Sequence, residues 1–380
     1  MLIIELTVAG MAVALVAARP RSMAVALAVP AIALVECGPR AITPAVASVG
    51  PAVVFLSAVM RLALLAERSG LAARLADVLL AAGRGSVFRL FWWVCGTCAL
   101  LTAALSLDGA VVVMAPVLLA MRNRGVPQRP LLLGTVAVAN AFSAALPAGN
   151  PTNLVVMERL GLEPAAFVAR MGVPSLLATL VCVLAVVLVE RRALWLGYKP
   201  RERPALRLDR GQRFPALLLA AAALADWLSP LFGFSPWLPV AAIALVAGRG
   251  LRLGVLPLRV GAQVGGLLLV LEALPHVSLP AGSLLALLEI AGLTALLSGL
   301  ANNLPAAAAV AAAMGPGAAP YAALLGLSAG ALVTPHGSVA TIASLELADA
   351  ATPPRWLRTW VPAAALALAA GTALLWLGVP

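Results

Sequence analysis

Long apolar runs recur from one end of this chain to the other, and they constrain its fold more than any other feature. Hydrophobic residues make up 63% of the 380 positions, whereas charged residues make up 11%. Runs of about 17–25 apolar residues are long enough to cross the hydrocarbon core of a bilayer as helices. Lipid offers no partner to backbone polar groups, so such spans fold as helices. The sequence therefore predicts an all-α polytopic protein of a lipid bilayer.

The net charge of +11 comes from short basic loops between the apolar runs. The densest group of arginines lies within residues 191–213. Basic loops of membrane proteins tend to stay in the cytoplasm, so this segment is predicted to be a cytoplasmic loop. No nucleic-acid partner is expected. Residues 1–40 are expected to form N-terminal transmembrane helices.

Two apolar stretches are predicted to be hairpins, because each has a polar centre. Residues 89–122 contain "SLDG" at their centre, and residues 282–314 contain "ANNLP". Basic residues flank the first stretch at both ends, which places both ends on the cytoplasmic side. The second stretch lies in a window without lysine or arginine and is expected to enter from outside. Both are predicted to be re-entrant helical hairpins, with their non-helical centres covered by protein or water.

Each hairpin is followed by a span whose helix should be broken near its middle. Residues 131–157 contain "LPAGNPTN", and residues 320–346 contain "VTPHGSVAT". Proline removes a backbone donor and disrupts a helix interior, while glycine permits an unwound conformation. The half-helix ends at such a break carry partial charges that bind ions or polar solutes. We therefore expect two broken transmembrane helices that form a binding site.

The order of a hairpin and then a broken helix occurs twice. The first copy covers residues 41–190 and the second covers residues 214–380. Pairing the two breaks sets Gly149 against Gly337, and pairing the hairpin tips sets Asp108 against Asn303. Since the hairpins are expected to enter from opposite sides, the sequence predicts an inverted-topology repeat, which is a common plan of secondary transporters.

Polar residues at the two tips and the two breaks are the candidate site. Asp108 is the sharpest of them, because a charged side chain inside a membrane is costly and is usually functional; it is also suited to cap the second leg of its hairpin. Asp108 and His336 are candidates for proton coupling, although His336 also fits a core histidine. The others fit either solute binding or helix capping. The candidate substrate- or ion-binding residues are Asp108, Gly109, Gly149, Asn150, Thr152, Asn153, Asn302, Asn303, Thr334, Gly337, Ser338 and Thr341.

Five segments resemble the arsenite permease (ArsB) family of the ion-transporter superfamily: "ERSGL", "LDGAVVVMAPVLLAM", "LPAGNPTNLVV", "ANNLP" and "TPHGSVAT". The superfamily also includes sodium:dicarboxylate symporters, citrate–metal carriers and NhaD-type antiporters. Dicarboxylate carriers have a serine-asparagine-threonine motif at both hairpin tips, which this chain lacks. In the second break, the family usually has an apolar residue at the position where this chain has His336.

The resemblance implies a secondary active transporter of the inner (plasma) membrane. Its expected activity is the efflux of arsenite or antimonite coupled to protons. A sodium-coupled carrier of small anions and a sodium/proton antiporter are the alternatives. The resemblance also implies a homodimer and allows an ATPase subunit as partner. No cofactor is expected apart from a coupling Na⁺ or H⁺.

Two further interpretations concern the cysteines and catalysis. Cys95 and Cys98 are spaced to share one face of a helix; they fit apolar packing, or a thiol contact with trivalent arsenic. Their surroundings contain no second pair of ligands, so a metal site is not expected. An enzyme is not expected either, because His276 and His336 are far apart and form no H-E-x-x-H motif.

Overall fold

The computed structural model describes residues 11–12, 15, 22–37, 42–199, 208–232, 237–247, 262, 266, 282–315, 317–347 and 355–378. Within these residues the chain folds into helices, with no strand element among them. The expectation of an all-α fold is thus confirmed for the described part. The first of the expected N-terminal helices lies largely outside the described residues, as do residues 200–207 of the basic loop.

The helices of the first half begin with α2 and end with the short α9. Their bounds are α2 Met23–Cys37, α3 Ile42–Arg68, α4 Leu71–Gly83, α5 Val87–Arg122, α6 Gln128–Phe142, η2 Ser143–Ala145, η3 Pro147–Gly149, α7 Pro151–Leu160, α8 Pro164–Val189 and α9 Arg191–Leu194. Those of the second half are α10 Arg210–Leu228, η4 Ser229–Phe232, α11 Trp237–Val246, α13 Leu284–Ala301, α14 Asn303–Ala313, α15 Ala319–Gly330, α16 Val339–Leu347 and α17 Trp356–Trp376.

Four described helices are long and apolar enough to cross a membrane. They are Val87–Arg122, Pro164–Val189, Leu284–Ala301 and Trp356–Trp376. Their outward faces carry large apolar side chains, such as Leu188 at 73% exposure and Leu296 at 64%. Water would penalise such surfaces, whereas lipid accepts them. The chain is therefore a multi-pass membrane protein.

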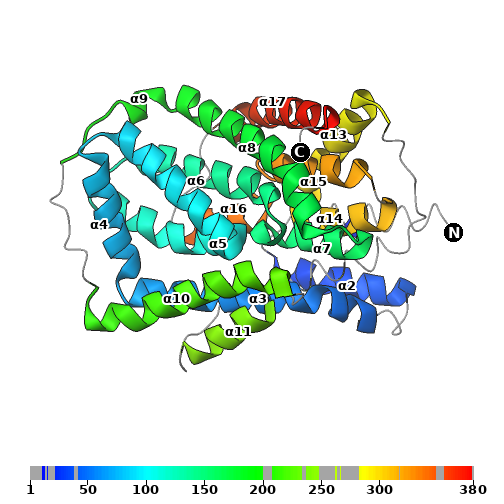
Figure 1. The fold of residues 1–380 in the computed structure, drawn as a ribbon, viewed down its shortest axis with the longest axis horizontal. Coiled ribbons are helices and arrows are strands. Elements are labelled where there is room, and N and C mark those ends of the chain that lie inside the picture. Colours follow the sequence, from blue (N-terminus) through cyan, green and yellow to red (C-terminus); the bar gives the residue numbers. More distant parts are fainter. Residues whose placement is uncertain are drawn as a thin grey trace.

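Figure 1 shows how the helices are layered. α3, α10 and α11 pack together along one edge of the molecule, while α8 and α17 pack together along the opposite edge. Between these layers lie α5 and α6 from the first half and α15 and α16 from the second. α16 packs against α5, and α14 packs against α7, so each half of the chain supplies helices to the other.

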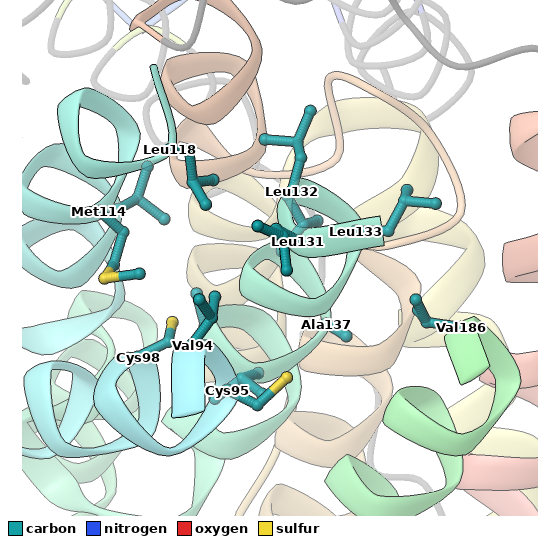
Figure 2. Close-up of a cluster of buried hydrophobic side chains, with 14 of the residues drawn as sticks. Val94, Cys95, Cys98, Met114, Leu118, Leu131, Leu132, Leu133, Ala137 and Val186 are labelled. Carbon is teal, nitrogen blue, oxygen red and sulfur yellow. The ribbon is translucent and has the colours of Figure 1, made fainter. Parts of the chain in front are cut away.

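Helix α5 changes direction at Ser106, whose φ of 63° and ψ of 174° are not helical. Figure 2 draws Val94 and Cys98, which precede this residue, beside Met114 and Leu118, which follow it, and all four belong to one buried cluster. A straight helix rises 1.5 Å per residue, so side chains this far apart in sequence meet only where the helix folds back. The chain thus turns back within "SLDG".

Helices α13 and α14 meet at Asn302, which has a comparable backbone conformation, with φ 86° and ψ 148°. The two helices pack against each other. The Asn302 side chain accepts a hydrogen bond from the N–H of Leu304 at 3.3 Å and so caps α14. The turning residues Ser106 and Asn302 therefore share a backbone conformation. Aligning these two residues sets Asp108 against Leu304, which differs by one position from the expected pairing of Asp108 with Asn303.

Replacing Ser106 by glycine is expected to stabilise the folded protein by about 1 kcal/mol. A positive φ combined with ψ near 180° is open to glycine but strained for a residue with a Cβ atom. Thermal unfolding of the purified protein in detergent measures the change. Ser106→Ala retains the Cβ and therefore the strain, so its unfolding temperature should not rise. An unfolding temperature lower for Ser106→Gly than for Ser106→Ala would contradict a strained turn.

Candidate functional site

The first break lies between α6 and α7, where the short 3-10 turns η2 and η3 interrupt the α-helix. Pro151 begins α7, at a position where its missing N–H costs nothing. Asn150 caps this helix, because its Oδ1 accepts the N–H of Thr152 at 3.0 Å. The Nδ2 of Asn150 donates to the Oγ of Ser143 at 3.3 Å. The side chain of Asn150 thus supplies partners that the interrupted helix does not provide.

Asn153 fixes the shape of the same break. Its Nδ2 donates to the carbonyl oxygens of Ser143 and Leu146, both at 2.8 Å. The side chain is fully buried. Buried carbonyl groups without partners are costly, so the amide of Asn153 stabilises the unwound backbone.

The second break lies between α15 and α16 and is held by hydroxyl groups. Ser338 Oγ accepts the N–H of Thr341 at 3.0 Å and so caps α16. Thr334 Oγ1 donates to the carbonyl of Gly299 at 2.6 Å, which ties the break to α13. The same types of contact thus hold both breaks, although the residues differ.

In each break, a glycine lies close against the carbonyl group of an earlier residue of the same break. An ideal Cβ built on Gly149 would lie 2.5 Å from the carbonyl oxygen of Ser143, and one built on Gly337 would lie 2.5 Å from that of Ala331. Each carbonyl precedes its glycine by the same number of residues. The pairing of Gly149 with Gly337, made on sequence, therefore has a matching geometry.

A buried hydrogen-bonded network joins the two breaks. Asn140 Nδ2, from α6, donates to Thr341 Oγ1, from α16, at 3.1 Å across 201 positions of sequence. Thr341 Oγ1 is also 2.9 Å from Ser338 Oγ. On the other side, Ser143 Oγ donates to the carbonyl of Asn140 at 2.8 Å. The network therefore brings together the predicted residues Asn150, Ser338 and Thr341 from the two halves of the chain.

The two hairpin tips meet their breaks differently. In the second half, Asn302 Nδ2 donates to the carbonyl of His336 at 2.9 Å, and the N–H of Asn303 donates to that of Gly337 at 2.8 Å. In the first half, α5 packs against η3. Among the described residues, however, no hydrogen bond joins residues 106–109 to residues 143–150. The second tip is thus docked by hydrogen bonds, and the first is not.

Asp108 lies in the first tip as a buried carboxylate, 8% exposed. In the described part of the chain it has neither a hydrogen-bond donor nor an ion-pair partner. Burial of a charge without a partner costs several kcal/mol. Gly109, next to it, is buried against Val59 of α3. An isolated carboxyl group of this kind can hold a proton or meet a solute.

The remaining predicted residues differ in burial. Asn150, Thr152, Asn303, Ser338 and Thr341 are buried. Thr334 and His336 are half-buried at the second break. The ring of His336 interacts with the backbone of Leu300 at the end of α13.

Residues that the sequence did not single out complete the site. Asn140 and Ser143 belong to the network, and Ser106 forms the first tip. Asn140 is a lone amide in the apolar run "LLLGTVAVANAFSAA". Its isolation is a signal that could have identified it, because a buried amide in an apolar span needs partners. Ser106 gives no such signal, since serine in a turn is ordinary.

Several buried side-chain oxygens near the first break have no hydrogen-bond partner in the structure. They are Ser106 Oγ, Asn140 Oδ1, Thr152 Oγ1 and Asn153 Oδ1. At the second break the hydroxyls of Ser338 and Thr341 are paired, and Ser328 Oγ of α15 is unpaired. Among the described buried atoms at the two breaks, more unpaired oxygens therefore lie at the first break than at the second.

Cys95 and Cys98 lie in an apolar cluster rather than at the breaks. Figure 2 shows them among Val94, Leu131 and Met114, with the two sulfur atoms pointing in different directions. The thiol of Cys98 contacts the carbonyl of Thr135 at 3.5 Å. Within the described ranges no group of three or more His, Cys, Asp or Glu could hold a metal ion. This placement favours the interpretation of the cysteines as apolar packing residues.

Comparison with known proteins gives two findings. Residues 12–330 match the model of a family described as "Citrate transporter" (CitMHS). A protein of Bacillus subtilis (strain 168) named "Putative arsenical pump membrane protein" is 31% identical over 140 residues. That alignment covers 35% of this chain and 32% of the relative, so this chain spans about a third of the relative it matches.

The close approach at the two breaks predicts that alanine is not tolerated there. Gly149→Ala and Gly337→Ala should each destabilise the protein by about 1–3 kcal/mol, because the added methyl group would overlap a carbonyl oxygen. Gly96→Ala is the matched control, since nothing lies within 4 Å of its added Cβ and it sits in the helical part of α5. This control should be neutral or slightly stabilising. Denaturation in detergent measures all three, and equal effects would contradict the geometry of the breaks.

Proposed function

The chain belongs to the citrate transporter family, and we propose that it exports arsenite and antimonite in exchange for protons. The family model covers residues 12–330, which is most of the chain. Membership supports a secondary transporter with an ion or small solute as cargo. The likeness to an arsenical pump membrane protein over about a third of the chain supports the arsenical cargo.

The observation that carries the proposal is the chemistry of the network between the breaks. It consists of amides and hydroxyls, and no lysine or arginine occurs within residues 131–157 or 320–346. A site for a free dicarboxylate needs positive charge, which these segments do not supply. The nearby Asp108 carboxylate would repel a dianion further. Arsenous acid is a neutral molecule with three hydroxyl groups, which amides and hydroxyls bind well.

We assign roles to the candidate residues on this basis. Asp108 exchanges the coupling proton, and His336 assists at the second break. The polar groups and the glycine-lined backbone hold the solute between tips and breaks. The proposed binding residues are Gly109, Gly149, Asn150, Thr152, Asn153, Asn302, Asn303, Thr334, Gly337, Ser338 and Thr341.

The proposal includes an architecture for transport in the inner membrane. Residues 41–190 and 214–380 are an inverted-topology repeat, and their two hairpins are re-entrant. The shared backbone conformation of Ser106 and Asn302 and the matched closure at Gly149 and Gly337 support this relation. Movement of the site between two sides then gives alternating access. A homodimer and an ATPase partner are compatible with this scheme.

A sodium-coupled carrier of small anions is the second candidate. The name of the family favours it, because citrate is a carboxylate. The unpaired oxygens of Asn153 and Thr152 could also coordinate Na⁺. In that case the cation would provide the positive charge that the two breaks lack.

Transport into everted membrane vesicles tests the proposal. A proton gradient should drive accumulation of arsenite by the wild type, and Asp108→Asn should reduce that accumulation at least about tenfold. Asparagine has the shape of aspartate but cannot bind and release a proton. The readout is the arsenic content of the vesicles, with and without the gradient.

Asp77→Asn serves as the control for this test. Asp77 pairs with Arg124 at 3.1 Å on the partly exposed surface of α4, where an ion pair contributes little. This variant should transport normally. Undiminished accumulation by Asp108→Asn would remove Asp108 from the coupling, and uptake of citrate driven by sodium in place of arsenite would favour the second candidate.

A further inference from the structure

Two buried amides near the first break have an orientation that the backbone determines. Asn140 Nδ2 donates to the carbonyl of Val136 at 2.9 Å, in addition to Thr341 Oγ1. Asn153 Nδ2 donates to the carbonyls of Ser143 and Leu146. A carbonyl oxygen only accepts hydrogen bonds, so in each amide the nitrogen must face the carbonyl. The atom that is left over is therefore an oxygen in both cases.

These two oxygens are buried and unpaired. Asn140 is 1% exposed and Asn153 is fully buried, and the Oδ1 atom of each has no partner. Ser143 links the two residues, because its Oγ donates to the carbonyl of Asn140 and its carbonyl accepts from Asn153. Thr152, next to Asn153, has a third unpaired oxygen. The three residues thus lie within residues 140–153, at the end of α6 and the start of α7.

The corresponding region of the second half does not offer the same atoms. Pairing Gly149 with Gly337 sets Asn153 against Thr341 and Asn140 against Ser328. The hydroxyl of Thr341 is already engaged by Asn140 and Ser338. Ser328 has an unpaired hydroxyl, which can donate as well as accept. At these paired positions, oxygens that can only accept hydrogen bonds, namely Asn140 Oδ1 and Asn153 Oδ1, occur at the first break.

We propose that Asn140 Oδ1 and Asn153 Oδ1 form a paired acceptor site for an electropositive ligand, and that Asn140 is a specificity-determining residue of the transporter. The inference rests on the proposed function, in which the ligand is the hydroxyl hydrogen of arsenous acid. A cation such as Na⁺ has the same complementary chemistry. A carboxylate without a bound cation offers acceptors alone, so the site rejects it.

The position of Thr341 allows the acceptor role to be separated from the structural role. Thr341→Val removes the hydrogen bond between the breaks with little change in shape. Asn140 then still donates to Val136, so its oxygen retains its direction. Asn140→Leu removes the same hydrogen bond and the acceptor oxygen with it. In the Thr341→Val background the hydrogen bond is already absent, so any further effect of Asn140→Leu there reports the acceptor oxygen.

Calorimetric titration of the purified full chain in sodium-free detergent buffer provides the test, with arsenite, NaCl and citrate as separate probes. Arsenite should bind the wild type, and Asn140→Leu should weaken this binding about tenfold, as loss of one hydrogen bond predicts. The same substitution should weaken binding by a similar factor when it is introduced into Thr341→Val, because the acceptor oxygen is lost in both backgrounds. Thermal unfolding checks that the variants fold, and Asn140→Ala replaces Asn140→Leu if the latter does not. The acceptor site is overturned if Asn140→Leu does not weaken binding in the wild type, or if it causes no further weakening in the Thr341→Val background.

The other probes separate this inference from the proposed function. If the wild type binds no arsenite, the proposal that arsenite is the cargo is wrong. The acceptor site can then still be tested by the binding of sodium. Sodium that binds the wild type and binds Asn140→Leu about tenfold more weakly then supports a cation at the site. Sodium that does not bind, or binds both alike, overturns it. Citrate that binds without a cation and loses affinity in Asn140→Leu also overturns it.

Discussion

Breaking a helix inside an apolar body leaves backbone groups that need new partners, and the centre of this protein is organised around that requirement. The side chains of Asn150 and Asn153 supply those partners at the first break, and Ser338 does so at the second. The hydrogen bond between Asn140 and Thr341 then joins the two repaired breaks. The polar residues of the site therefore stabilise the folded structure, independently of any role in transport.

Much of this arrangement could be predicted from the sequence, because proline and glycine inside an apolar run have few structural explanations. The two breaks and the two turns within "SLDG" and "ANNLP" were predicted on that basis. The turning residue of the first tip could not be predicted, since a positive φ at Ser106 has no signature in the choice of serine. The role of Asn140 depends on contacts across the fold, and local spacing does not contain them.

The two halves of the protein differ more than their shared plan suggests. The second hairpin is hydrogen-bonded to its break through Asn302 and Asn303, and the hydroxyls at that break are paired. The first hairpin packs against its break without such bonds in the described structure, and its surroundings retain unpaired oxygens. Among the described residues, the second break is therefore held by more hydrogen bonds to its hairpin, and the first break retains more unpaired oxygens.

The unpaired oxygens of the first break have a consequence for turnover. Such atoms bind water whenever the site has room for it, so in the proposed mechanism an incoming solute exchanges one set of hydrogen bonds for another. Because only the difference between the two sets appears as net binding, the affinity stays modest even when the fit is good. Modest affinity would be a disadvantage for a receptor, which must retain its ligand. It is an advantage for a carrier, since a weakly bound cargo dissociates quickly on the far side and frees the protein for its next cycle.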